Sequence, residues 1–291
     1  MAKLTKKQLA YLFAVVYKRQ RGAGRRGRVD AKVLKARIDA PDTMAHLTKG
    51  QVAEEVRGQL RRVEKTWGKV LIDRAVRHVI VCDNEMELKR RLKEDAPWQT
   101  GTQKLRNLIG LCRLDTIYMN GASLEAEAEF KDRLSRCSRS DPGGAWLYLD
   151  ARAKEARAKF SGCFDHEVGH AVANTMTDLR LPRTVLSAYK KVAEESSRHY
   201  NGMLLAEKLS REGRSDVVWQ DGVGWNASDV RKTISSYSLK STSEHQAEAI
   251  EAYVHERATL RKKAPALCDA LDGLTRETRK IRRPWWKLPN G

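Results

Sequence analysis

Apolar residues recur at helical spacing in the region that follows residue 48. Thr48 and Gln51 form a capping-box pattern, in which each side chain can bond a backbone N–H at the start of a helix. After them, apolar side chains recur at steps of three and four residues, as one buried stripe of a helix requires. The stripe consists of Val52, Val56, Leu60, Val63 and Trp67. We therefore predict an amphipathic helix here, within a basic helical section that covers residues 1–72.

The pattern then changes to short apolar runs rich in β-branched and aromatic residues. Such runs, bounded by turn residues, are typical of strands. The runs cover residues 78–82, 114–119 and 146–149, and turn residues lie at 120–121 and 141–144. We expect three or four strands, and between the two turns the charged stretch 124–134 predicts an exposed helix.

Beyond residue 151 the spacing is helical almost to the end of the chain. The exception is the glycine-rich stretch 216–228, where we predict a loop that covers the cleft. These patterns together predict an α+β fold that is mostly helical and contains a small mixed or antiparallel sheet. We place one domain at residues 73–262, and a basic C-terminal helix end and tail at residues 263–291.

Basic residues outnumber acidic residues, which points to acidic partners. Lysine and arginine number 56 against 37 acidic residues, so the formal net charge is +19. The first 28 residues carry nine basic side chains and no acidic one. The last sixteen residues carry six basic side chains and the pair Trp285 and Trp286, which could stack on bases, dock on a partner or cover apolar surface of the same chain. We expect these two segments to bind nucleic acid or another acidic partner.

Cysteine usage and hydropathy indicate a cytoplasmic protein. The five cysteines are scattered and form no CxxC pair, which favours neither a disulfide framework nor a thiolate zinc site. An apolar run at residues 9–17 follows three lysines, as in a secretory signal. Lys18 and Arg19 follow this run in place of a cleavage site, and the run is too short to span a bilayer, so we expect no membrane association.

The clearest candidate for chemistry is the sequence His-Glu-Val-Gly-His at residues 166–170. On a helix, the imidazoles of His166 and His170 lie about 40° apart around the axis and one turn apart along it, so both can bind one metal ion. Glu167 can take a proton from a metal-bound water without being a ligand. The alternative is a surface helix with two ordinary histidines. A zinc peptidase also needs a third protein ligand and an open fourth position.

A second helical stretch, at residues 237–253, offers acidic side chains downstream of this motif. Ser235, Tyr237, Ser238, Glu244, Ala247 and Glu248 follow the pattern Ser-x-Tyr-small-x-x-x-x-x-Glu-x-x-Ala-Glu. With this pattern and its His-Glu-x-Gly-His sequence, the chain resembles the gluzincin peptidases related to the anthrax lethal factor catalytic domain, and similar domains carried by phages and mobile elements. A metzincin would have histidine where this chain has Met176, so that class is excluded.

The resemblance implies a zincin-like fold and a zinc-dependent endopeptidase that hydrolyses a protein or peptide. It makes His166, His170 and Glu244 the ligands of Zn²⁺. Glu167 would be the general base, and Tyr237 would stabilise the oxyanion. Glu248 would hydrogen-bond a ligand histidine and fix its tautomer. A phage-encoded chain could also be associated with the virion.

The sequence also suggests where a substrate would bind and what the alternative function would be. The substrate would pair with an edge strand, with residues 117–120 as the first candidate and 146–149 as the second. The alternative function is a phage-associated structural or nucleic-acid-binding protein with a zincin-like fold and little or no peptidase activity. A closed structural zinc site would then need a fourth ligand, for which Cys163 is the candidate.

The sequence contains four histidines that fit no such pattern, and we expect structural or surface roles for them. They are His46, His78, His199 and His255.

Overall fold

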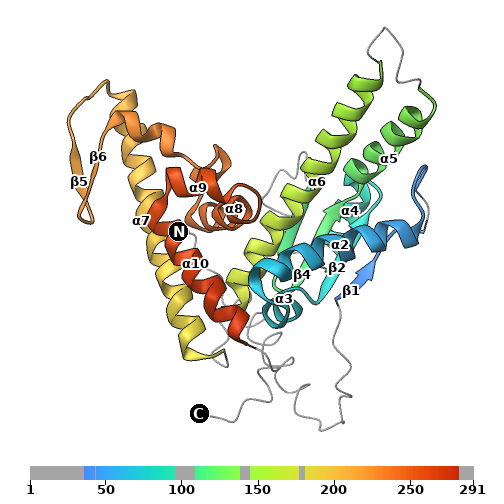
Figure 1. The fold of residues 1–291 in the computed structure, drawn as a ribbon, viewed down its shortest axis with the longest axis horizontal. Helices are drawn as coiled ribbons and strands as arrows, with labels where there is room; N and C mark the ends of the chain where they lie inside the picture. The colour runs from blue at the N-terminus through green and yellow to red at the C-terminus, as the bar shows by residue number, and fades with distance from the viewer. Residues whose placement is uncertain (1–35, 43, 96–108, 138–144, 177–180, 282–291) are drawn as a thin grey trace. The chain divides into compact units, whose positions relative to one another are not determined.

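Four short strands form a mixed sheet within the residues that the structure describes (Figure 1). This computed structural model describes residues 36–42, 44–95, 109–137, 145–176 and 181–281. The strands are β1 (Arg37–Asp39), β2 (His78–Cys82), β3 (Gly110–Arg113) and β4 (Thr116–Asn120). Their order across the sheet is β1-β2-β4-β3, where β1, β2 and β4 are parallel and β3 is antiparallel to β4.

Neither segment predicted to bind a substrate as an edge strand lies at an edge of the sheet. Residues 117–120 belong to β4, which lies between β2 and β3 and has no free edge. The edge strand next to β4 is β3. It has only four residues, all partly buried, and its sequence contains no clear apolar run. Leu114 is in the β3–β4 turn, where its φ is 55°.

Residues 146–149 are helical, so the strand predicted there is wrong. They begin α6 (Ala145–Thr175), which runs on through the His-Glu-x-x-His sequence. The four apolar residues continue a helical stripe, because Leu149, Ala153, Ala156 and Phe160 are all buried at steps of three and four residues. A run this short does not separate strand from helix unless its continuation is considered.

The described chain is mostly helical, which confirms the predicted α+β class. Its other helices are α2 (Lys49–Trp67), α3 (Lys69–Ala75), α4 (Glu85–Asp95), α5 (Ala122–Ser135), α7 (Arg183–Arg211), α8 (Thr242–His255), α9 (Arg257–Lys263) and α10 (Pro265–Lys280), with 3₁₀ turns η1 (Ala227–Lys232) and η2 (Tyr237–Leu239). The predicted capping box of Thr48 and Gln51 is present, and α5 covers the predicted exposed helix. None of the described helices combines the length and apolarity that crossing a membrane requires.

One hydrophobic core joins α2 to the helices that follow. The predicted stripe of α2 is buried, and Val56 and Trp67 have no exposed surface. Both belong to the same core as Phe164 of α6 and Ile250 of α8. The compact unit begins at Ala36, and the domain boundary predicted at residue 72 falls inside α3. The basic segment 1–28, the turn at 141–144 and the tryptophan pair lie outside the described residues.

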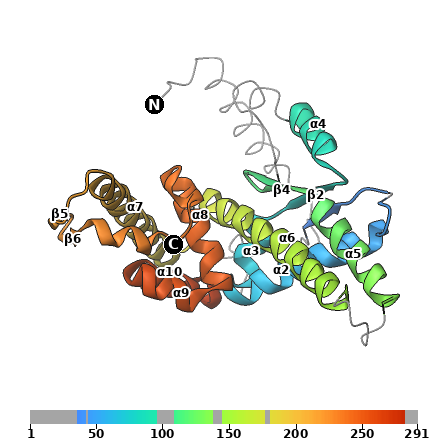
Figure 2. The same ribbon diagram turned by 90° about the horizontal axis from the view of Figure 1, so that it is seen from above.

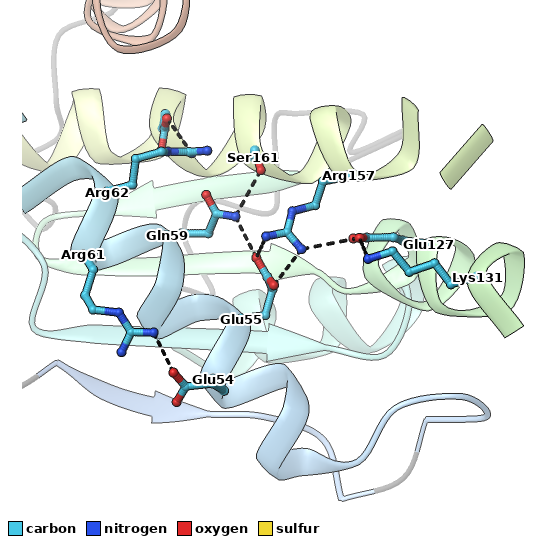
Figure 3. Close-up of polar contacts among 10 residues, drawn as sticks. Glu54, Glu55, Gln59, Arg61, Arg62, Glu127, Lys131, Arg157 and Ser161 are labelled. Carbon is cyan, nitrogen blue, oxygen red and sulfur yellow. Dashed lines mark hydrogen bonds and ion pairs between the residues drawn. The ribbon is translucent and has the colours of Figure 1, made fainter. Parts of the chain in front are cut away.

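A polar network fixes the N-terminal half of α6 against α2 and α5. Figure 3 shows Arg157 of α6 between Glu55 of α2 and Glu127 of α5, at 2.6 Å and 3.4 Å. The amide of Gln59 donates to the hydroxyl of Ser161 at 3.1 Å. Because Glu127 and Gln59 are buried, these contacts give partners to the carboxylate of Glu127 and to the amide nitrogen of Gln59, which would be costly to bury alone.

The stretch predicted as a loop at 216–228 instead contains a hairpin of β5 (Val218–Gln220) and β6 (Val223–Trp225). Asp221 and Gly222 both have positive φ angles, which is the tight Asp-Gly turn that joins antiparallel strands. Trp225 packs on α7, where its ring occupies the space that a Cβ on Gly202 would need. The hairpin is therefore attached to α7.

Candidate metal centre

The centre is built where α6 and α8 cross at close range. The two helices lie side by side in both ribbon views (Figures 1 and 2). At the crossing, a Cβ on Gly169 would lie 3.0 Å from the Cα of Ala247 and 3.2 Å from its carbonyl oxygen. These are backbone atoms that cannot move aside, so the glycine before the second histidine allows the two helices to approach. The sequence places it there, inside the His-Glu-x-Gly-His pattern.

Three predicted ligands meet at this crossing. Oε2 of Glu244 lies 3.0 Å from Nε2 of His166 and 3.2 Å from Nε2 of His170. Donor atoms bound about 2.0–2.2 Å from a tetrahedral zinc ion are about 3.3 Å apart, so these separations suit one shared ion. The two imidazole rings are nearly perpendicular, with centroids 4.9 Å apart. Among the described residues, these three form a group able to hold a metal ion.

The N-terminus of α8 positions Glu244. The hydroxyl of Ser241 accepts a hydrogen bond from the backbone N–H of Glu244 at 3.1 Å, which places the carboxylate in the first turn of the helix. Hydrogen bonds with His166 and His170 lower the pKa of Glu244 to about 2. The carboxylate is therefore ionised at neutral pH, as a metal ligand must be.

Glu167 is buried beside the histidines and against the edge strand β3. Burial raises the pKa of its carboxyl group, whereas both histidines and a backbone hydrogen bond from Cys112 act in the opposite direction. A Cβ on Gly110 would lie 3.0 Å from Cγ of Glu167, so a glycine of β3 makes room for this side chain. A carboxylate with a raised pKa in a buried site is suited to accept a proton.

Two carboxylates face the other ring nitrogen of His166. Oε1 of Glu248 lies 2.9 Å from Nδ1 of His166, within reach of the hydrogen bond predicted for it. Oε2 of Glu251 lies 3.6 Å from the same atom. The sequence analysis did not identify Glu251. Its spacing could have revealed it, because Glu244, Glu248 and Glu251 continue one helical stripe at steps of four and three residues.

No known family model, curated protein or solved structure matches the chain.

Tyr237 lies at the edge of the same cluster, on the 3₁₀ turn η2. Its ring centroid is 5.6 Å from that of His166, and the two rings meet edge to face. Burial raises the pKa of its phenol, and the charge of Glu244 adds to this effect. The phenol is therefore protonated at neutral pH and can donate a hydrogen bond, and 41% of the side chain is still exposed.

Cys163, the candidate for the fourth ligand of a closed zinc site, does not lie with the three predicted ligands. Neither metal-binding group found among the described residues contains a cysteine. The thiol of Cys163 lies beside Gly110 of β3, 2.8 Å from the position of a Cβ on that glycine. Cys163 therefore does not supply a fourth ligand to the three predicted ones.

Asp165 connects α6 to the far end of α8. Its side chain is completely buried, and its Oδ2 lies 2.8 Å from Arg62 of α2 and 2.6 Å from His255 of α8. Asp165 immediately precedes the first ligand histidine, and His255 ends the helix that carries Glu244. This contact therefore holds the two ligand-bearing helices in register, which gives His255 the structural role expected of it.

A buried histidine pair supports the helix α8 from the side of α7. Nδ1 of His199 lies 3.0 Å from Nε2 of His245, and Nε2 of His199 lies 3.3 Å from the carbonyl oxygen of Lys263. Burial lowers the pKa of His199 to about 4. His199 therefore has the structural role that the sequence analysis allowed for it.

We expect this burial to make the fold sensitive to acid. An unfolded chain protonates His199 below about pH 6.5, whereas the folded chain does so only near pH 4. The unfolded state then binds more protons, so stability is lost as the pH falls from about 6.5 to about 4, by about 1.4 kcal/mol per pH unit for this group. Urea unfolding at several pH values should show a shallower loss in His199→Gln. The exposed His46→Gln should leave the slope unchanged, and an equal slope in both variants would contradict the expectation.

Proposed function

We propose that the chain is a zinc-dependent endopeptidase with a zincin-like active site. The observation that carries this proposal is the meeting of His166, His170 and Glu244 from two helices 74 to 78 positions apart in sequence, at separations that suit one ion. Two nitrogen donors and one carboxylate form a donor set typical of catalytic zinc, and three protein ligands leave the fourth position for water.

Bound Zn²⁺ would lower the pKa of its water toward neutrality and polarise the substrate carbonyl. Glu167 takes the proton of the attacking water on its buried carboxylate. Glu167 then donates that proton to the leaving amine as the peptide bond breaks. Tyr237 donates a hydrogen bond from its protonated phenol to the oxyanion that forms at the carbonyl.

The substrate would add to the sheet along β3. This strand forms one edge of the sheet, and its Gly110 and Cys112 lie against Glu167. A peptide bound there by backbone hydrogen bonds would bring a scissile bond close to the general base. Because backbone groups recognise backbone groups, this mode of binding suits an extended segment of a protein substrate.

The test is hydrolysis of a mixed peptide library by the zinc-loaded full-length chain, read by mass spectrometry. We expect cleavage of internal peptide bonds, its loss when a chelator removes the metal, and its recovery when zinc is added back. Cleavage that persists at full rate in the chelated protein would reject the metal-dependent mechanism. A zinc-loaded chain that cleaves no peptide or protein would reject the proposed function itself.

A further inference from the structure

The Nδ1 atom of His166 is shared between two carboxylates. The side chain is 10% exposed, and Nδ1 itself is buried. Glu248 approaches this atom to 2.9 Å and Glu251 to 3.6 Å, yet Nδ1 makes a well-directed hydrogen bond to neither. His166, Glu248 and Glu251 form a compact group whose polar atoms lie within 4.8 Å of one another. The nitrogen therefore faces both acceptors.

A glycine on α6 makes room for the second carboxylate. A Cβ on Gly162 would lie 2.8 Å from Oε1 and 3.8 Å from Cδ of Glu251. Gly162 is one turn before His166 on the same helix. Glycine lowers helix propensity in a helix interior, and here the space it leaves is occupied by the carboxylate of Glu251.

The two carboxylates also face a water-accessible space behind the ligand histidine. Glu248 and Glu251 line a cavity of about 910 Å³ whose walls come from α2, α5, α6 and α8. The side chains of Glu248 and Glu251 are 16% and 27% exposed. Glu251 can therefore turn toward this water or toward His166 without unpacking the core.

We propose that Glu251 is a positioning residue for the metal centre, acting through Nδ1 of His166 as a second acceptor beside Glu248. The proposal rests on the proposed function, because it assumes that Nε2 of His166 binds the metal. A carboxylate on Nδ1 fixes the tautomer that leaves Nε2 free and makes the imidazole a stronger donor to the ion. With two carboxylates, the loss of one contact is partly replaced by the other.

The test measures the zinc affinity of the full-length chain by competition with a chromophoric chelator. Glu251→Gln keeps the shape of the side chain, and we expect it to weaken zinc binding about 10-fold. In a Glu248→Gln background the same change should have a larger effect, because no carboxylate then remains for Nδ1. Glu256→Gln is the matched control: it removes a charge from the same cavity, and no contact joins Glu256 to His166 among the described residues.

A steric variant tests the contact without changing the charge. Gly162→Ala places a methyl group against the flexible end of Glu251, so the carboxylate must move while the helix gains propensity. We expect weaker zinc binding in the same direction as in Glu251→Gln. The absorption bands of the cobalt(II)-substituted protein should also shift in both variants and stay unchanged in Glu256→Gln, which a general loss of stability would not produce.

Three results would overturn the inference. They are wild-type zinc affinity of Glu251→Gln in both backgrounds, equal weakening by Glu256→Gln, and an unchanged affinity in Gly162→Ala. Each of these leaves the proposed function intact if the wild-type chain binds one zinc ion and cleaves peptides. A wild-type chain that binds no zinc would instead overturn the inference and the proposed function together.

Discussion

Glu167→Gln should strongly reduce the rate of peptide cleavage and leave the metal bound. The amide has nearly the same shape as the carboxylate but cannot accept the proton of the attacking water. General acid–base groups contribute rate factors of about 10² to 10⁴, so we expect the turnover rate to fall by that range. Because Glu167 does not belong to the group of atoms that could hold the metal, zinc content measured by mass spectrometry should match that of the wild-type chain.

The matched control for this variant is Glu155→Gln on the same helix. Glu155 is exposed and pairs with Arg152 on the surface of the helix, so its replacement should change neither cleavage nor zinc content. A Glu167→Gln protein that still cleaves at the wild-type rate would remove Glu167 from the mechanism. Loss of zinc from that variant would instead assign Glu167 a role in metal binding.

Glu244→Gln should release the metal from a chain that remains folded. The carboxylate supplies the only negative charge among the three predicted ligands, and it contacts both ligand histidines. Replacing a carboxylate that merely orients a ligand costs about 10- to 100-fold in metal affinity, so loss of a direct ligand should cost at least about 100-fold. Zinc affinity and far-ultraviolet circular dichroism of the purified variant check the two parts of this expectation.

The control is Glu256, which lies at the end of α8 opposite to Glu244. Glu256→Gln at the C-terminus of α8 should bind zinc as the wild type does. Tight zinc binding by Glu244→Gln would show that the third ligand is another group, and the proposed gluzincin arrangement would then be wrong.

The sequence was sufficient to predict the features that depend on local periodicity. The capping box and the apolar stripe of α2 are present, because both arise from residues within a few positions of one another. The pattern that suggested Glu244 and Glu248 singled out two residues of α8 that lie near the histidine motif, Glu244 beside both histidines and Glu248 beside His166. Their catalytic roles remain predictions.

Features that depend on packing between distant segments were not predicted. The strand at the edge beside Glu167 is β3 and not β4, because β4 pairs on both sides, and pairing order is not encoded in the apolar run of β4 itself. The apolar run at 146–149 is the first turn of α6, and four apolar residues alone do not distinguish a helix from a strand. The Asp-Gly turn of the hairpin was visible in the sequence, but the contact of Trp225 with Gly202 of α7 was not.

The predicted ligands His170 and Glu244 lie far apart along the chain, on either side of α7. An ion that joins His170 to Glu244 would close a loop of 74 residues containing α7 and the β5–β6 hairpin. Because folding brings these two residues together, the free energy of ion binding would add to the stability of the folded segment between them. Zinc would then stabilise this segment reversibly. Loss of the ion would destabilise the segment around α7 as well as stop the proposed hydrolysis.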